Sequence, residues 1–362
     1  MIESLRNKFV KERFDLQEIL LVPVFATVLA LLIGCFFLLA TGETLANIFV
    51  AYYSLFIGSL GSLNAISETF TAATPLVFAA LGIALAFRAG LFNIGAEGQM
   101  IIGGLATVIV GFSIDFLPIW IHLPLALSIG ALFGALYAAI AGWLKAYTGA
   151  HEVISTIMLN LIALRLLDYV LRSPIIQKEG RNDPISKSIL DSAELPQILT
   201  FVDPQLRLHG GFLLMLVAVF FIYWLLFHTT IGYEFRATGA NPNAAKYAGI
   251  KAGLTIVLVM AIAGALAGLA GANQITGVLG RASPGFSASI GFDAIAVALL
   301  GRSHPIGVLF AGLLFGALIA GGRLMQVKAG VSVDLITIIQ ALIIVFIAAP
   351  LLVKKSLPWF FK

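Results

Sequence analysis

The sequence predicts an all-α, polytopic membrane protein: a transmembrane bundle of about ten helices in two inverted repeats, with both termini in the cytoplasm. Three observations support this fold. Hydrophobic residues make up 60% of the 362 residues and charged residues only 11%, whereas about a quarter of the residues of soluble domains are charged. The apolar residues form runs long enough to cross a bilayer as helices. Basic residues fall mostly in the connections between these runs.

The apolar runs give the number of helices. About twenty apolar residues cross a bilayer as a helix. The candidate spans, in chain order, are residues 19–40, 68–88, 91–112, 119–144, 152–172, 212–228, 254–280, 286–302, 304–322 and 331–352. The eighth is the weakest, because Pro284, Gly285 and Gly291 crowd its start. The sequence leaves open whether this span crosses the bilayer or re-enters it.

Lysine and arginine orient the bundle. They are more numerous on the side that holds both termini, which the positive-inside rule places in the cytoplasm. Residues 1–18 then form a cytoplasmic segment, residues 19–353 a single transmembrane domain and residues 354–362 a cytoplasmic tail. The long polar connection 173–211 lies outside, either as a solvated excursion or as a docking face for another protein, and the connection 229–253 lies inside. We therefore expect a multi-pass protein of the cell membrane.

Two similarities within the chain indicate an internal repeat. Asn93–Glu97 resembles Ser289–Asp293, and Gly130–Leu136 resembles Gly312–Leu318 in six of seven positions. In the ten-span topology the matched spans run in opposite directions, so the two halves are expected to be inverted repeats with the substrate path between them. Chance recurrence of glycine, alanine and leucine in apolar sequence is the alternative.

Polar side chains interrupt the apolar sequence at the first of these similarities. Asn93 and Glu97 are four residues apart and share one helix face, as do Ser289 and Asp293 in the other half. An acid at membrane depth is unfavourable unless it meets a partner or a water-filled path, so it marks a functional site. The residues predicted here to line a translocation path or contact substrate are Phe92, Asn93, Glu97, Gln99, Ser289, Phe292 and Asp293. The alternative is that each acid only pairs with backbone groups freed by neighbouring glycines.

A second polar line begins the fifth span. Glu152, Thr156 and Asn160 are spaced by four residues on an apolar helix and are predicted to line the cytoplasmic part of the path. His151 precedes them, but no second histidine follows at a chelating spacing. We therefore expect no metal site.

The connection 229–253 contains the signals of a short helix. Asn241 and Pro242 can begin it, and Gly249 can end it. A membrane subunit needs such a helix to receive movement from a separate motor protein. The chain lacks the phosphate-binding motif of an ATP-hydrolysing motor, and it also lacks serine-hydrolase, zinc-protease and dinucleotide motifs. An enzyme is therefore not expected.

Three runs of sequence resemble one family of membrane proteins. Residues 87–100 read FRAGLFNIGAEGQM, residues 149–160 read GAHEVISTIMLN and residues 239–250 read GANPNAAKYAGI. They are similar to permease subunits of ABC importers of the ribose and branched-chain amino-acid group, and within it to the nucleoside (simple sugar) uptake branch. The resemblance extends over nearly the whole chain from the second span onward.

The resemblance implies a permease that moves nucleosides or related ribose-containing solutes by alternating access. It also implies three protein partners: a second permease subunit in a heterodimer, a cytoplasmic ATP-binding subunit and an extracytoplasmic substrate-binding lipoprotein. ATP would be bound by the partner, so this chain itself is expected to bind no cofactor and no nucleic acid. The residues implied in coupling to the ATPase are Gly239, Ala240, Asn241, Pro242, Ala244, Ala245, Tyr247 and Gly249.

Two other functions stay open. An ABC permease for a simple sugar would carry similar motifs. A secondary transporter working alone would also contain inverted repeats and buried acids, but it would follow an ion gradient and ignore ATP depletion. The sequence does not separate purine from pyrimidine nucleosides.

Overall fold

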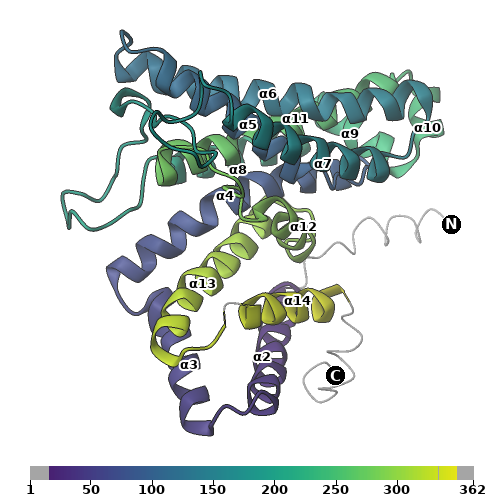
Figure 1. The fold of residues 1–362 in the computed structure, drawn as a ribbon. Coiled ribbons are helices and arrows are strands. Elements are labelled where there is room, and N and C mark those ends of the chain that lie inside the picture. Colours follow the sequence, from purple (N-terminus) through teal and green to yellow (C-terminus); the bar gives the residue numbers. More distant parts are fainter. Residues whose placement is uncertain (1–15, 333, 349–362) are drawn as a thin grey trace, which may run out of the picture. The chain divides into compact units, whose positions relative to one another are not determined.

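The computed structural model describes residues 16–332 and 334–348. Apart from two isolated β-bridges, these residues form helices joined by turns and loops (Figure 1), which confirms the all-α class. The α-helices are α2 (Leu16–Ala40), α3 (Leu45–Leu60), α4 (Leu63–Arg88), α5 (Ala96–Ser113), α6 (Ile119–Thr148), α7 (Glu152–Leu171), α8 (Gly211–His228), α9 (Thr230–Ala240), α10 (Pro242–Tyr247), α11 (Ala252–Gln274), α12 (Ile290–Leu300), α13 (Pro305–Ala329) and α14 (Asp334–Ala348). Residues 1–15 of the predicted N-terminal segment and the whole predicted tail, 354–362, lie outside the described residues.

Within the described part of the chain, seven helices are long and apolar enough to cross a membrane. They are α4, α5, α6, α7, α8, α11 with the turn that follows it, and α13. Each overlaps a predicted span, α2 covers the first predicted span, and α14 lies within the last. The sequence analysis missed α3, because its 16 residues are fewer than the number needed to cross a bilayer.

The described residues fall into two compact units. The smaller unit contains residues up to Phe56 and from Gly322 onward, and the larger unit is Ile57–Gly321. In the smaller unit α2 packs against α14, and the Tyr52 hydroxyl donates a hydrogen bond of 2.6 Å to the Leu31 carbonyl. All the predicted path and coupling residues lie in the larger unit.

Helix α11 is the central helix of the larger unit and packs on α4, α5 and α6. Glycines allow its backbone to touch that of α6. A Cβ at Gly268 would overlap the Gly130 carbonyl, and a Cβ at Gly134 would overlap the Gly264 carbonyl. In lipid, where burial of apolar surface does not drive helices together, such close backbone packing stabilises a bundle.

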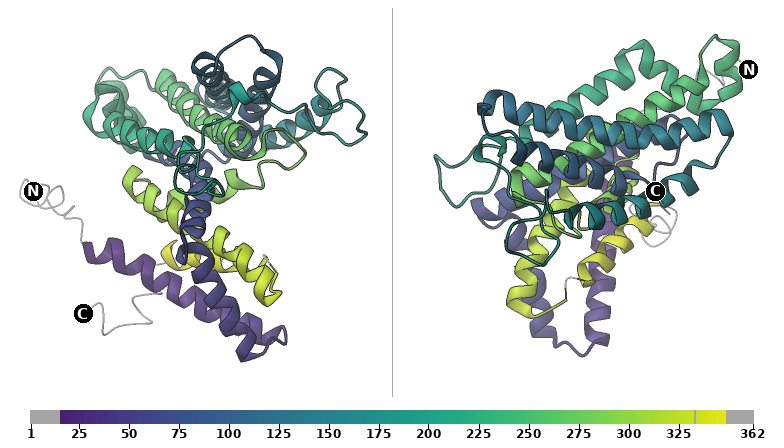
Figure 2. Two further views of the ribbon diagram at one scale, coloured as in Figure 1. Left: turned by 90° about the vertical axis from the view of Figure 1, so that its left-hand side faces the viewer. Right: turned by 45° about the horizontal axis from the view of Figure 1, so that its top comes forward.

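The segment between α7 and α8, residues 172–210, is here called the cap segment. Figure 2 shows it as a run of loops with little helix. It is not a free excursion, because its backbone bonds to the residues at the end of α11. Ile189 N–H donates to the Gly280 carbonyl and Leu195 N–H donates to the Thr276 carbonyl, both at 2.9 Å. The cap segment is therefore part of the packed unit.

The eighth predicted span is a broken element. A π-helical turn, Ile275–Leu279, ends α11, and residues 280–289 are not helical. Helix α12 follows with 11 residues, about 16 Å at 1.5 Å per residue, whereas the hydrocarbon core of a bilayer is about 30 Å thick. Ala288 and Ser289, immediately before α12, adopt the left-handed conformation with φ of 47° and 62°. This break brings the start of α12 against the start of α5.

Candidate functional site

The turn that precedes α5 is shaped by its own amide side chains. Asn93 Nδ2 donates to Gln99 Oε1 at 3.1 Å, and Gln99 Nε2 donates back to Asn93 Oδ1 at 3.0 Å. The Gly95 N–H also donates to Asn93 Oδ1, at 3.0 Å. Both amides are buried, so their hydrogen bonds fix the turn in one conformation.

Helix α7 holds the same turn from the side. Asn160 Oδ1 accepts from the Gly98 N–H at 2.8 Å, and Asn160 Nδ2 donates to the Ile94 carbonyl at 2.9 Å. The Gly98 N–H is one of the donors that the first turn of a helix leaves without an intrahelical partner. Asn160 therefore caps α5 from another helix.

Glu97 joins α5 to α12. Its carboxylate accepts from the Ser287 hydroxyl at 2.5 Å and from the Gly291 N–H at 2.8 Å, and the side chain is buried. The Gly291 N–H lies in the first turn of α12, where the helix dipole favours a negative charge. A Cβ at residue 291 would overlap the Glu97 backbone, so this contact requires glycine.

We call Asn93, Glu97, Gln99, Asn160, Ser287 and Gly291 the polar junction. It ties together the starts of α5 and α12 and the middle of α7. Residues that it joins by a hydrogen bond lie up to 194 residues apart in the sequence. The junction is a satisfied hydrogen-bond network inside an otherwise apolar bundle, and such networks fix one arrangement of the helices that they join.

Asp293 differs from Glu97, although the two acids occupy matching places in the repeat. Asp293 is half-buried, and none of the described residues donates a side-chain hydrogen bond to its carboxylate. It lies near enough to Glu97 for their charges to interact. Phe292 beside it is 45% exposed, and Ser289 caps α12 without a side-chain hydrogen bond. This face of α12 therefore presents an unpaired acceptor beside an aromatic ring.

The polar line on α7 faces the bundle interior. Glu152, Thr156 and Asn160 are all buried. Glu152 forms an ion pair with Lys145 at the end of α6, with 2.8 Å between Oε2 and Nζ. Thr156 Oγ1 donates to the Glu152 carbonyl of its own helix at 2.8 Å. Their hydrogen bonds and ion pair join α6, α7 and the turn before α5.

Phe92 lies at the edge of this group. Its ring is 43% exposed and contacts the Phe87 ring at 4.7 Å between centroids. Of the predicted path residues, the structure gathers the amides, Glu97 and the α7 line around the start of α5. It leaves Phe92, Phe292 and Asp293 with surface that another molecule can touch.

Sequence reasoning missed two residues that hold the ends of α12. Ser287 donates to Glu97, and Arg88 Nε donates to the Ser303 carbonyl at 2.9 Å, just beyond the other end of α12. Arg88 stands in the motif of residues 87–100 and is basic in the last turn of α4. Ser287 gave no signal, because its partner is 190 residues away.

The predicted coupling segment forms two short helices, α9 and α10. Asn241 Oδ1 caps α10 by accepting from the N–H groups of Asn243 and Ala244, Pro242 occupies the first turn, and Gly249 follows with φ of 84°. The helix is exposed except for Ala245. The predicted start and end of this helix are confirmed.

The coupling segment touches the turn that leads to the polar junction. A Cβ at Gly239, in the last turn of α9, would overlap the carbonyl of Arg88, and Gly90 lies against Gly239 from the other side. Backbone therefore meets backbone between the α4–α5 turn and α9.

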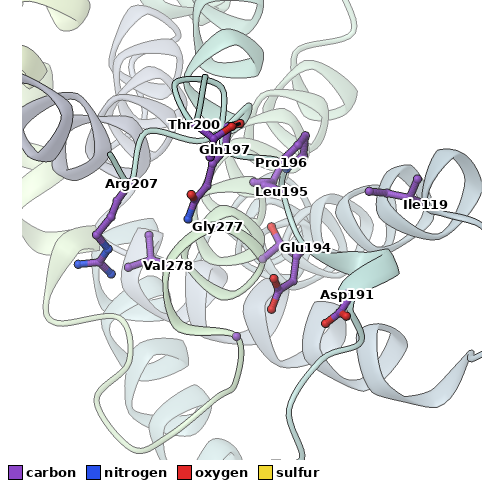
Figure 3. Close-up of a pocket in the computed structure, with 12 residues that line it drawn as sticks. Ile119, Asp191, Glu194, Leu195, Pro196, Gln197, Thr200, Arg207, Gly277 and Val278 are labelled. Atoms are coloured by element: carbon purple, nitrogen blue, oxygen red, sulfur yellow. Dashed lines mark hydrogen bonds between the residues drawn. The ribbon is translucent and has the colours of Figure 1, made fainter. Parts of the chain in front are cut away.

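A cavity of about 590 Å³ lies elsewhere in the larger unit, between the cap segment and the end of α11. Figure 3 shows Arg207 on one side of it and the carboxylates of Asp191 and Glu194 on the other. Thr276 and Gly277 belong to its wall. None of the predicted path residues is among the residues that line it.

Comparison with known proteins gives consistent matches along the chain. A family described as "Branched-chain amino acid transport system / permease component" matches residues 65–348. The guanosine ABC transporter permease protein NupP of Bacillus subtilis is 40% identical, over 91% of this chain and 93% of the relative. The nucleoside ABC transporter permease protein NupB of Lactococcus lactis subsp. cremoris is 36% identical, over 93% of each chain. The glucose ABC transporter permease protein TsgB13 of Haloferax volcanii is also 36% identical, over 90% of this chain and 86% of the relative. No solved structure matches significantly.

Proposed function

Because the chain belongs to the family of permease components of branched-chain amino acid transport systems, we propose that it forms the translocation path for nucleosides or related ribose-containing solutes in an ATP-driven importer. The chain is a multi-pass protein of the plasma membrane and a permease subunit, not an enzyme. The observation that carries the substrate proposal is the sequence identity of 40% and 36% to a guanosine and a nucleoside permease over more than nine tenths of the chain.

We assign the predicted path residues two roles. Asn93, Gln99 and Asn160 hold the turn before α5 and so frame the path, and Glu152 and Thr156 support them. Glu97 holds the start of α12 at the path wall. The residues proposed to contact substrate directly are Phe92, Ser289, Phe292 and Asp293. Aromatic faces suit a nucleobase, and a carboxylate suits ribose hydroxyl or base N–H donors.

We propose the predicted topology for this importer. Ten segments enter the membrane in two inverted halves, the eighth as the broken element that contains α12. Both termini and α9–α10 face the cytoplasm, and the cap segment faces outward. The distribution of lysine and arginine supports this orientation. The contact between the starts of α5 and α12, which carry the repeated sequence, supports a path between the halves.

The importer needs partners that this chain does not contain. A permease of the ABC class works with an ATPase and a substrate-binding protein. We propose a second permease subunit in a heterodimer, a cytoplasmic subunit that binds the ATP, and an extracytoplasmic lipoprotein. The exposed face of α10 supports its assignment as the helix that rests on the ATPase. Neither a cofactor nor a metal is assigned to this chain.

Uptake by intact cells tests the substrate. A strain lacking the protein is expected to lose uptake of radiolabelled guanosine or uridine and to keep uptake of ribose and leucine. Restoring the gene restores uptake, and depleting ATP abolishes it. Nucleoside uptake that persists in the deletion strain would contradict the proposal. Uptake that survives ATP depletion and follows an ion gradient would identify a secondary transporter.

A simple sugar is the second candidate substrate. It is favoured by one observation, the 36% identity to a glucose permease over most of both chains. Adding labelled glucose to the same uptake experiment separates the two proposals. Loss of glucose uptake with nucleoside uptake intact would assign the chain to sugar transport.

A further inference from the structure

Helix α12 lies between two pairs of residues in an unusual conformation. Ala288 and Ser289 precede it with φ of 47° and 62°, and Arg302 and Ser303 follow it with φ of 51° and 52°. Among the described residues, these four are the non-glycine residues with positive φ. Left-handed backbone is unfavourable for such residues and persists only where the surrounding structure enforces it, often at switch regions. Both ends of α12 therefore need external support.

Both supports come from one short segment of the chain. At the start of α12, the Glu97 carboxylate holds the Ser287 hydroxyl and the Gly291 N–H. At the other end, Arg88 Nε donates to the Ser303 carbonyl at 2.9 Å. Residues 88–97 thus hold α12 at both ends, and a displacement of this segment is transmitted to the helix.

The same segment rests on α9. The Arg88 carbonyl lies against Gly239 in the last turn of α9, which leads directly into α10. The Arg88 guanidinium also lies over the Phe227 ring, 5.8 Å from its centroid, and shares that ring with Arg236 of α9 at 5.4 Å. Cations over an aromatic face are attracted to the ring, so Phe227 holds both side chains, while the backbone contact at Gly239 joins Arg88 to α9. Arg88 therefore touches α9 and the end of α12 at once.

We propose that Arg88 is a positioning residue for transport: it passes movement of α9–α10 to α12 and so to Phe292 and Asp293 at the path wall. This inference rests on the proposed function in one respect, that α9–α10 receives movement from the ATPase. Arg88 does not touch the substrate. It acts through the Ser303 carbonyl, while Glu97 holds the start of α12 in place through its hydrogen bonds.

Arg236 provides a matched control for Arg88. Both guanidinium groups lie over Phe227, but Arg236 Nε donates to the Gly232 carbonyl of its own helix at 3.4 Å. Methionine has a methyl group in the place of Nε, so Arg88→Met removes both the charge and the donor to Ser303. Arg236→Met removes the same charge from the same ring without touching the Ser303 contact. An effect of Arg88→Met that Arg236→Met does not share therefore reports the link to α12.

The first experiment measures coupling in vesicles that contain the complete importer. ATP hydrolysis and nucleoside uptake are followed together, and the membrane level of each variant is measured. Arg88→Met is expected to lower uptake per ATP at least tenfold while hydrolysis continues. Arg88→Lys, whose ammonium can still donate to Ser303, should stay within threefold of wild type, and Arg236→Met within twofold. An unchanged ratio for Arg88→Met, or an equal loss for Arg236→Met, overturns the proposal.

A variant that fails to reach the membrane does not end the test. If Arg88→Met is absent from the membrane, Arg88→Leu is compared with Arg236→Leu, because leucine also has no donor for the Ser303 carbonyl. The proposal requires a lower uptake per ATP for the first and a wild-type value for the second. Equal values for the two variants overturn it.

A second experiment does not depend on the substrate. Cys35 is the only cysteine, so Cys35→Ser allows spin labels at Leu299 of α12 and Leu161 of α7, both exposed. The distance between these labels is expected to change when ATP and vanadate trap the complete importer, and Arg88→Met should abolish this change. A control pair at Ile140 and Leu161 should stay constant. A constant Leu299–Leu161 distance in the wild type, or the same change in Arg88→Met, overturns the inference, whereas absent nucleoside uptake contradicts only the proposed function.

Discussion

At the scale of single residues, Glu97 shows how a buried acid is accommodated in an apolar bundle. A charge in a low-dielectric interior is unfavourable unless it is paired and hydrogen-bonded. Glu97 accepts from a hydroxyl and from an N–H at the positive end of α12. The carboxylate therefore satisfies its neighbours and is satisfied by them.

Removing this carboxylate tests its role in transport. Glu97→Ala leaves the Ser287 hydroxyl and the Gly291 N–H without an acceptor, at about 1–3 kcal/mol for each buried group. We expect the variant to reach the membrane but to lose nucleoside uptake, because the start of α12 is no longer held. Uptake and membrane level are measured together. Glu97→Gln, which keeps one acceptor oxygen, should retain part of the uptake.

Two outcomes of this substitution would count against a transport role. Glu97→Ala that transports within twofold of wild type contradicts the importance of the contact. Loss of the protein from the membrane would instead indicate that Glu97 only supports the fold.

His209, in the cap segment, predicts a pH dependence. Its ring is buried beside Gly277, and neither ring nitrogen has a hydrogen-bond partner in the described part of the chain. Burial first, and then the charge of Arg207, lower the pKa of His209 from 6.5 to about 4. When the cap segment unfolds, the His209 ring becomes exposed and binds a proton more readily than the buried ring does. Acid therefore favours unfolding of the cap segment.

The sign and size of this effect follow from the two pKa values. The free energy of unfolding has its full value above about pH 6.5. It falls as the pH drops towards about 4, by about 3 kcal/mol in total. Thermal unfolding of the purified protein between pH 7 and pH 4 measures it. His209→Gln should reduce the decline in melting temperature, while the exposed His228→Gln should keep it. Equal declines in the two variants would rule out His209 as the cause.

At the scale of elements, α10 is a short helix with strong local signals and few contacts of its own. Its capping residue, its proline and its closing glycine define its ends. Of its residues only Ala245 is buried, with 3% of its surface exposed. Helix α10 therefore packs on the rest of the protein through this one side chain. Its remaining surface is exposed and can contact a partner.

A substitution of Ala245 should uncouple uptake from ATP hydrolysis. Ala245→Glu places a larger, charged side chain where only a methyl group fits, which displaces α10. We expect uptake per ATP to fall about tenfold, as a 1.4 kcal/mol loss of coupling would give, while ATP hydrolysis continues. Deleting Asn241–Gly249 should have the same effect. Ala248→Glu, at an exposed position beside the helix, is the control, and transport unchanged by Ala245→Glu would contradict the coupling role.

At the scale of the whole molecule, sequence reasoning succeeded where the signal was local. Runs of apolar residues located the long helices, and Asn241, Pro242 and Gly249 located α10. It failed for α3, whose 16 residues include tyrosine, serine and asparagine and fall short of a bilayer crossing.

The candidate site could be predicted only in part, for a physical reason. Asn93, Glu97 and Asn160 were found because polar groups in apolar sequence need partners. The partners of Asn93 lie within six residues of it, but those of Glu97 and Asn160 lie 62 to 194 residues away, which no spacing encodes. The left-handed backbone conformation of Ser289 and Ser303 could not be predicted from the sequence either, because serine does not require this conformation.

The exposed surface of the helices agrees with a position in the membrane. The large exposed side chains of α6 and α7 are mostly apolar, such as Leu136, Trp143 and Leu161, as lipid-facing surfaces are. Polar groups are instead gathered at the starts of α5 and α12. This distribution supports the proposed polar path through an apolar bundle. As a permease subunit of an ABC transporter, the chain takes its energy from a separate ATPase chain.

Reconstitution of the complete importer tests that claim most directly. The chain is purified with the proteins that bind it, placed in lipid vesicles, and supplied with tritiated guanosine and ATP. We predict that guanosine accumulates against its gradient when ATP is hydrolysed and does not accumulate with a non-hydrolysable analogue. Accumulation by this chain alone, driven by a proton or sodium gradient without ATP, would contradict the account.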